Sequence, residues 1–327
     1  MNLIRSVFGV LLVLGVGLMV GGPGIEAAEG PTARPEAQPA AYQSHYLVFG
    51  TRDASGAPRL LAIDFNRMQE GPERVSYEYK LFVAEGGDWS MPVYETWEAS
   101  PSEDPFPARG GLTPVRDADG TLRAVRAQTA DLRLEVRPGD SAFPFPTDAP
   151  ESGNRTGHPT FTVTWNGTTY EGPGVYEWIE SDAAPDPDHP TRDRQLSEEA
   201  TFGLYDWIVL YDEQGRLWHV SQGTLTSDFA YQQAVPSLPS QTRDVMVRWT
   251  ATTPDSLAGL HAPHRWLVDV PAWELRVSLR KEGEHRGHGA ERADGTRPIY
   301  VQATAVGPGI VRGEEQQFFG MVEHIRD

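Results

Sequence analysis

Short stretches that alternate apolar and polar residues, separated by turn-forming pairs, run through this chain from Tyr42 onward. Typical stretches are HYLVFG, VSYEYKLFVAE and LRLEVRP, and the pairs include Ser-Gly, Gly-Gly, Asp-Gly and Pro-Gly. Alternation with a period of two is the pattern of a β-strand, and such pairs form tight turns between strands. Only one weak helical candidate stands out, TRDRQLSEEAT at residues 191–201. The pattern therefore predicts an all-β fold with little helix.

The chain is long enough for two domains. It has 327 residues, and the polar, Pro-rich stretch IESDAAPDPDHPTRDRQLSEE interrupts the strand pattern near the middle. We expect an N-terminal domain over residues 42–185, a linker over 186–200 and a C-terminal domain over 201–327.

The first 41 residues differ from the rest of the chain in composition and lack its strand pattern. Residues 1–28 combine a basic residue, an apolar run over 7–20 and a group of small residues, which is typical of a secretory signal peptide. The run is short for a bilayer span, and a retained membrane anchor is the alternative. Residues 29–41 are rich in Pro, Ala and Glu and predict a flexible tether. We therefore expect export, to the periplasm or the medium, with no stable membrane span after signal cleavage.

Charge and cysteine content exclude several classes of function. With 28 Lys and Arg against 46 Asp and Glu, the net charge is −18, which would repel nucleic acid. The absence of cysteine excludes disulfides, thiol nucleophiles and cysteine-ligated metals. Two His-x-x-His pairs, His261 with His264 and His285 with His288, lie in a strand-like and a Gly-rich segment. We expect neither a metal site nor a cofactor, and the oligomeric state stays open.

The two halves end on similar segments. GVYEWI occupies residues 174–179 and GMVEHI occupies residues 320–325, with Gly, Glu and Ile at matching places. The offset of 323 − 177 = 146 residues is about one domain length. This similarity predicts a duplicated all-β unit.

Four segments together resemble the AttH/carotenoid 1,2-hydratase-like family: TVTWNGTTYEGPGVYEWI, YDWIVLYDEQGRLWHV, HAPHRWLVDVPAWELRVSL and FFGMVEHI. The resemblance covers most of residues 42–327. It implies two tandem lipocalin-like (calycin-like) antiparallel β-barrels with an apolar cavity. The family's hydratase signature is Asp-His-x-Trp, whereas this chain has Val175, Tyr176, Glu177 and Trp178. Only the tryptophan matches, so the resemblance does not carry carotenoid hydration over to this chain.

Glu177 is the carboxylate that the pattern singles out, because it stands between Tyr176 and Trp178 on a predicted strand. Neighbours in a strand face opposite sides, so Glu177 faces away from both rings. If its face lines the cavity, burial raises its pKa and makes it a candidate general acid. If the other face does, the two rings form an aromatic wall and Glu177 is solvated. In a third interpretation, Glu177 and Glu323 are one repeated structural glutamate.

Asp206 is the second candidate acid, with a turn-forming aspartate as the alternative. Further aromatic and acidic side chains on strands complete the expected site. The candidate catalytic residues are Glu177 and Asp206, and the candidate ligand-binding residues are Tyr176, Trp178, Trp207, Tyr94, Trp97 and Glu323.

Three functions fit these observations. The first is an exported lipocalin-like protein that binds a hydrophobic or amphipathic small molecule, such as a lipid or isoprenoid, in an apolar barrel. The second is a cofactor-independent enzyme of the same fold, a hydratase, isomerase, cyclase or hydrolase that uses a buried carboxylate. The third is a carbohydrate-binding β-protein of the cell envelope. The sequence leaves open whether the protein is an enzyme.

Overall fold

A computed structural model describes residues 42–69, 73–101, 105–116, 122–139, 155–181, 205–223, 228–288, 291 and 295–326. The predicted signal peptide, tether, candidate helix and linker lie outside these residues. The described chain is almost entirely β-strand, and its one helical segment is the 3-10 turn η2 (Pro271–Trp273). The all-β prediction is confirmed. None of the described residues forms a helix long and apolar enough to cross a bilayer.

The N-terminal half forms a 10-stranded antiparallel sheet in the order β4-β3-β2-β1-β10-β9-β7-β6-β5, with β8 paired to β10. Its first strand therefore lies beside its last. The strands are β1 (Tyr42–Arg52), β2 (Pro58–Gln69), β3 (Val75–Glu85), β4 (Asp88–Ala99), β5 (Leu112–Arg116), β6 (Leu122–Gln128), β7 (Arg133–Pro138), β8 (Arg155–Gly157), β9 (Thr160–Trp165) and β10 (Thr168–Ser181).

The C-terminal half forms a 9-stranded antiparallel sheet in the order β14-β13-β12-β11-β19-β18-β17-β16-β15. Here too the first strand pairs with the last, as expected for a duplicated unit. The strands are β11 (Tyr205–Tyr211), β12 (Leu217–Gly223), β13 (Phe229–Gln232), β14 (Gln241–Thr242), β15 (Met246–Asp255), β16 (Leu260–Val270), β17 (Leu275–His288), β18 (Ile299–Val311) and β19 (Glu314–Arg326).

The hairpins follow from the turn-forming pairs. Gly86-Gly87, Asn166-Gly167 and Arg312-Gly313 each connect two strands through two residues with positive φ. This is the conformation that a two-residue hairpin of type I′ requires, and glycine and asparagine adopt it at low cost. The turn chemistry thus fixes the strand pairing locally.

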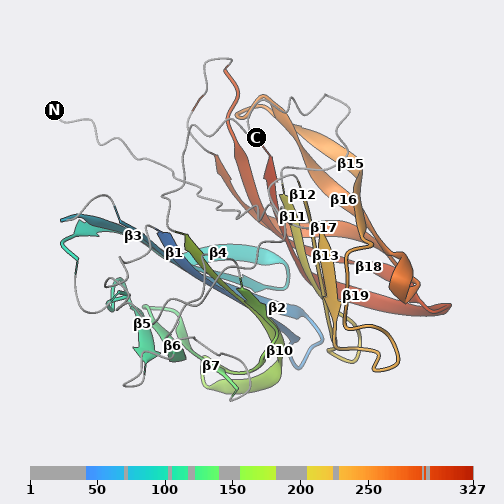
Figure 1. The fold of residues 1–327 in the computed structure, drawn as a ribbon, viewed down its shortest axis with the longest axis horizontal. Helices are drawn as coiled ribbons and strands as arrows, with labels where there is room; N and C mark the ends of the chain where they lie inside the picture. The colour runs from blue at the N-terminus through green and yellow to red at the C-terminus, as the bar shows by residue number, and fades with distance from the viewer. Residues whose placement is uncertain are drawn as a thin grey trace, which may run out of the picture.

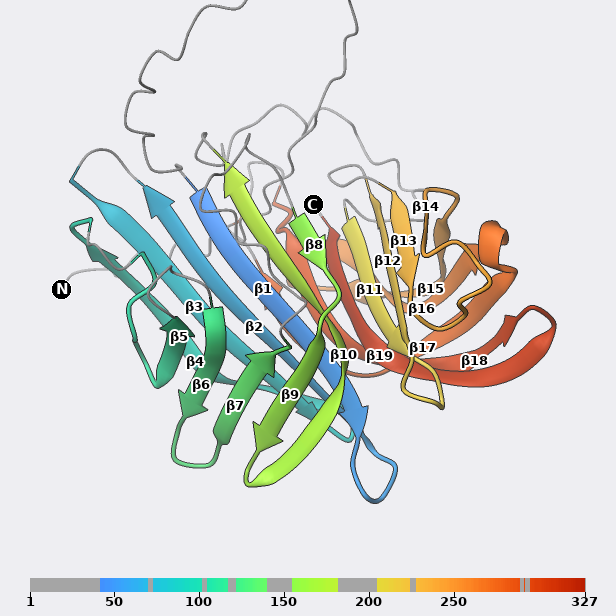
Figure 2. The ribbon, with the colours of Figure 1, turned by 60° about the horizontal axis from the view of Figure 1, so that its bottom comes forward.

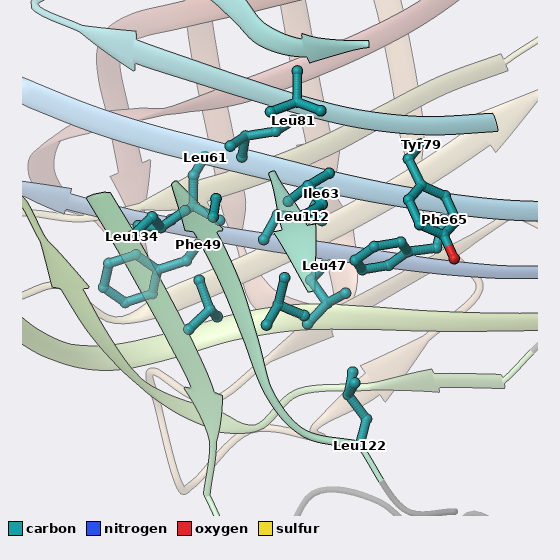
Figure 3. Packing of buried hydrophobic residues seen from close by; sticks show 14 of the residues in the cluster. Leu47, Phe49, Leu61, Ile63, Phe65, Tyr79, Leu81, Leu112, Leu122 and Leu134 are labelled. Atoms are coloured by element: carbon teal, nitrogen blue, oxygen red, sulfur yellow. The ribbon is translucent and has the colours of Figure 1, made fainter. Parts of the chain in front are cut away.

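Each sheet curls around its own apolar core, as the bending of β10 and β18 shows in Figure 2. In the N-terminal barrel this core contains Leu47, Ile63 and Leu81, which are fully buried (Figure 3). In the C-terminal barrel it contains Trp218, Trp266 and other buried side chains. The two tandem barrels predicted from the sequence are therefore present, and they lie side by side in Figure 1.

The outer faces of the two barrels pack on each other. We call this contact the seam. Its side chains come mainly from β1, β2, β3 and β10 on one side and from β11, β12 and β19 on the other. It consists of Tyr46, Val48, Leu60, Ala62, Phe82, Ala84, Val175, Tyr205, Trp207, Val209, Tyr211, Leu217, Phe319, Met321 and Ile325. Face-to-face sheet packing of this kind buries one side of every contributing strand.

Gly50 marks a close approach across the seam. A Cβ atom added there would lie 2.4 Å from Cε2 of Tyr211, well inside contact distance. We expect Gly50→Ala to lower the free energy of unfolding by roughly 1–3 kcal/mol, because the buried Tyr211 ring has to move. Chemical denaturation measures this loss. Gly172→Ala is the control, because its added Cβ would meet Phe49 at an ordinary 3.5 Å. Equal stability of the two variants would contradict the close approach.

Candidate functional site

One row of inward-facing side chains crosses the N-terminal barrel from β10 to β3. Trp178 pairs with His45, His45 with Phe65, and Phe65 with Tyr79 in the registers of neighbouring strands. The row is placed by strand alternation, since Leu47 and Phe49 on β1 share the face of His45 and lie in the core. Four of the rings in the barrel therefore stand at one level. We call them the aromatic row.

The environment changes along the barrel on either side of the aromatic row. The adjacent level toward one end contains the aliphatic Leu47, Ile63, Leu81 and Val93, and Tyr176, which pairs with Leu47. Figure 3 shows Phe65 and Tyr79 together at one end of this apolar cluster.

The adjacent level toward the other end contains Gln43, Arg67, Tyr77 and Trp97, and is mixed polar and aromatic. The barrel is thus apolar at one end and amphipathic at the other.

Ring contacts continue without a break from the barrel rim to its interior. Partly buried Trp97 stacks on Tyr77 at 4.6 Å between ring centroids and meets Tyr79 edge-on at 4.8 Å. Tyr79 meets Phe65 at 4.7 Å. Edge-to-face and stacked rings at these distances stabilise each other beyond simple burial.

Phe106 links this run to the polar residues of the site. Its ring lies 4.6 Å from the ring of His45, edge to face, and 6.4 Å from that of Phe65. His45 is in turn stacked between neighbours on β10, at 5.8 Å from Tyr176 and 6.2 Å from Trp178.

His45 and Tyr176 form a hydrogen-bonded pair inside this aromatic surround. The Tyr176 hydroxyl lies 2.5 Å from Nδ1 of His45. Burial, together with the positive charge of Arg116, lowers the pKa of His45 to about 3, so the imidazole is neutral at ordinary pH. Burial raises the pKa of Tyr176 well above its usual value. The pair therefore consists of a neutral phenol and a neutral imidazole joined by a short hydrogen bond.

Charged groups lie beside the aromatic row and at the rim, since Glu95 on β4 pairs with Tyr79 in the register of β3 and β4. The Arg109 guanidinium lies over the Trp97 ring at 5.4 Å, and its Nε is 3.8 Å from a Glu95 carboxylate oxygen. Buried Arg67 donates a hydrogen bond of 2.8 Å to Gln69. These groups give the open end of the barrel a polar border.

Glu177 does not face this row. It points out of the barrel into the seam, where its Oε1 accepts hydrogen bonds from the Trp207 indole at 2.9 Å and the Thr156 hydroxyl at 3.3 Å. Burial raises the pKa of Glu177 to about 7. The structure places the aromatic wall of Tyr176 and Trp178 on the inward face of β10, but Glu177 is buried and hydrogen-bonded in the seam and not solvated as that interpretation expected.

Glu323 occupies the corresponding place on the C-terminal barrel. Its Oε2 accepts hydrogen bonds from Tyr46 at 2.5 Å and Tyr300 at 3.3 Å. Burial, together with the negative charges of Asp64 and Glu177, raises the pKa of Glu323 to about 7. Glu177 of the N-terminal barrel thus faces the C-terminal barrel, and Glu323 of the C-terminal barrel faces the N-terminal one.

Asp206 points into the C-terminal barrel and is fully buried. It accepts hydrogen bonds from the indoles of Trp249 at 3.0 Å and Trp266 at 3.3 Å, and it lies 3.1 Å from Nδ1 of His324. These partners come from β15, β16 and β19, so Asp206 on β11 connects four strands. This environment is that of an internal anchor, and not the turn-forming role expected as the alternative.

The remaining sequence candidates are divided between the two faces. Trp97 lies with the aromatic row, Trp207 lies in the seam, and Tyr94 is on the outer face, 38% exposed, beside Glu78. Sequence reasoning missed His45, Phe65, Tyr79 and Phe106. The sequence does indicate the inward position of His45, because His45, Leu47 and Phe49 are each two residues apart and therefore lie on the same face of one strand.

The paired histidines do not converge. His285 packs on Phe82 at the seam, and His288 lies 3.0 Å from an Asp255 carboxylate oxygen that also pairs with Arg286. Within the described ranges, no three His, Asp or Glu side chains form a metal-binding group.

The anchoring of Asp206 predicts a large loss of stability on truncation. Asp206→Ala leaves three buried N–H groups without their acceptor, and we expect the free energy of unfolding to fall by roughly 3–5 kcal/mol. Denaturant titration measures the loss. Asp53→Ala is the control, since its carboxylate lies in an exposed turn, where it accepts hydrogen bonds from Ser55 and Ala57 and lies 3.6 Å from Nε of Arg59. A loss at Asp206 no greater than at Asp53 would contradict the anchor.

Comparison with known proteins bears on the fold. No protein-family model and no curated protein sequence matches the chain. Among solved structures it is similar to a putative AttH from Nitrosomonas europaea, with TM-score 0.51 and 14% identity over 91% of this chain and 97% of that one. It is also similar to kievitone hydratase from Nectria haematococca, with TM-score 0.50 and 12% identity over 89% and 91% of the two chains. The AttH-like resemblance is thus confirmed at the level of architecture: the chain has the fold of AttH-like and hydratase proteins.

Proposed function

We propose that this protein binds an amphipathic small molecule with an unsaturated or aromatic body in its N-terminal barrel. The observation that carries the proposal is the aromatic row with the His45–Tyr176 pair in its midst. Binding sites for small molecules combine mainly apolar walls with a few placed polar groups. The row offers both on neighbouring strands.

The direction of binding follows from the change in polarity along the barrel. The body of the molecule would lie against Phe65, Tyr79, Phe106 and Trp178, whose ring faces favour planar or π-rich partners. Its polar group would bond to the Tyr176 hydroxyl. A more polar end would reach the level of Arg67 and Trp97. A purely aliphatic chain would gain less from such walls.

An enzyme is the second candidate, and the short bond between Tyr176 and His45 favours it. With His45 in the tautomer that donates from Nδ1, the Tyr176 hydroxyl is left to donate its own hydrogen bond to a bound carbonyl oxygen and polarise it. Glu177 and Asp206 face away from this position, so the acid–base roles pass from these carboxylates to Tyr176 and His45. In that case Tyr176→Phe would abolish turnover of the natural substrate while its binding persists.

Export remains part of the proposal. The basic, apolar and small-residue sections of residues 1–28 support a cleaved signal peptide. N-terminal sequencing of the mature chain from its own host would test this. Native mass spectrometry of the same material, with solvent extraction, would identify a molecule retained in the barrel.

Matched aromatic probes test the polar contact. We expect Tyr176→Phe to weaken binding of 2-naphthol about 2- to 13-fold, the range of one neutral hydrogen bond. Binding of 2-methylnaphthalene, which has the same shape without the hydroxyl, should not change. Fluorescence titration of the full chain measures both affinities. Trp178→Ala should weaken both probes, because it removes part of the wall.

Tyr94→Phe is the matched control, since Tyr94 is a tyrosine on the outer face of the same barrel. It should change neither affinity. Equal effects of Tyr176→Phe on both probes, or an effect of Tyr94→Phe as large, would show that the probes bind elsewhere. Failure of the wild-type chain to bind either probe, together with a clean apo mass from its own host, would contradict the proposed function.

A further inference from the structure

We propose that Glu177 and Glu323 form a proton-operated latch between the two barrels, which holds the seam when both carboxyl groups carry protons and weakens when they ionise. The inference concerns the seam and does not depend on which molecule the N-terminal barrel binds. It rests on three features of the two glutamates: their symmetric placement, their burial and their neutral hydrogen-bond donors.

The two glutamates are bonded reciprocally. Within the N-terminal barrel Glu177 pairs with Tyr46 in the register of β10 and β1, and within the C-terminal barrel Glu323 pairs with Trp207 in the register of β19 and β11. Their side chains cross over: Trp207 donates to Glu177, and Tyr46 donates to Glu323. The rings of Tyr46 and Trp207 lie 5.4 Å apart between centroids. The seam thus has an approximate two-fold axis between these rings.

Every described donor to these carboxyl groups is electrically neutral. Glu177 has an indole and a hydroxyl, and Glu323 has two phenols. Gln302 completes the group by donating a 3.2 Å bond to the Tyr46 hydroxyl. A buried carboxylate without a cation is costly, whereas a buried carboxylic acid with hydrogen bonds is not. The seam is therefore built for the protonated form.

Other ionisable groups that face the seam do not supply the missing charge. Lys80 on β3 bonds to Asp64 at 3.4 Å and to Glu78 at 2.6 Å, so two carboxylates already share its charge. Burial lowers the pKa of His219 and of His285, which keeps both imidazoles neutral above pH 7. The ionisable groups around the seam are, by element, Tyr46 and Arg52 (β1), Asp64 (β2), Lys80 (β3), Tyr205 (β11), His219 (β12) with its partner His158, His285 (β17) and Tyr300 (β18). Arg52 lies at the far end of β1, over the Phe319 ring and bonded to the Gly56 carbonyl.

The dependence on pH has a definite sign. The pKa of each glutamate rises from 4.5 in an ordinary setting to about 7 in the folded protein. The folded state therefore binds protons more tightly than the unfolded chain, and stability falls as pH rises between these two values. Above pH 7 both groups are ionised and repel each other and Asp64. The latch is closed in mild acid and weakened in mild alkali.

A site-specific measurement follows the proton at Glu177. With ¹⁵N-labelled tryptophan in the full chain, the indole N–H resonance of Trp207 should shift with a midpoint near pH 7, because its acceptor changes charge. Its disappearance in Trp207→Phe assigns the resonance. A Trp207 resonance that does not move between pH 5 and pH 8 would overturn the proposal, whatever the stability of the variants.

Stability and hydrogen exchange test the latch itself. The thermal midpoint of the wild-type chain should fall between pH 5 and pH 8, while that of the double variant Glu177→Gln, Glu323→Gln should stay nearly level. Hydrogen exchange, corrected for its intrinsic pH dependence, should increase above pH 7 in β1, β10, β11 and β19 but not in β6 and β7, which lie away from the seam.

Glu135→Gln is the matched control. Glu135 is an outward glutamate whose pKa is lowered by hydrogen bonds from Arg126 and Arg137, so it stays ionised throughout this range. This variant should keep the wild-type slope. A double seam variant that also keeps the wild-type slope, or exchange that increases equally in β6 and β7, would overturn the latch.

Discussion

Strand alternation on four strands is the constraint on which the rest of this molecule depends. β1, β10, β11 and β19 each place one face in a barrel core and the other in the seam. A strand between two apolar environments has no face left for water, which is why these segments read as nearly continuous apolar runs. The polar side chains that these strands bury are paired: Tyr176 with His45 in the N-terminal barrel, Glu177 and Glu323 with donors in the seam, and Asp206 with His324 in the C-terminal barrel. The first two of these sites share β1 and β10.

The two sites are chemically different although they share a backbone. Tyr176 and His45 meet inside the N-terminal barrel, while their chain neighbours Glu177 and Tyr46 point into the seam. Inside, both partners of the pair are neutral and lie among rings. Outside, carboxyl groups depend on donors from the other barrel. A displacement of β1 or β10 at the seam therefore reaches the inner pair directly, through one peptide unit.

Much of this arrangement can be predicted from the sequence, and there is a physical reason why the rest cannot. Turn-forming pairs and alternation predict the strands, and the repeated Gly, Glu and Ile predict the matching last strands of the two halves. Alternation also separates Glu177 from Tyr176 and Trp178 correctly. Alternation does not tell which face of β10 is inward, because both the face with Val175 and the face with Tyr176 and Trp178 carry apolar side chains. Tyr94 and Trp97 are three residues apart, so simple alternation already places them on opposite faces, and the bulge in this strand pair lies beyond them, between Leu81 and Val83.

The reciprocal bonding across the seam has a consequence for the history of the chain. A dimer of identical single barrels packed about a two-fold axis would make this contact twice, with the same aromatic residue and the same glutamate each time. Once both barrels belong to one polypeptide, the two copies of the contact are free to diverge. Tyr46 and Trp207 now do the same task with different chemistry, whereas the glutamates have stayed alike. Fusion would thus have turned one inherited contact into two that natural selection can adjust separately.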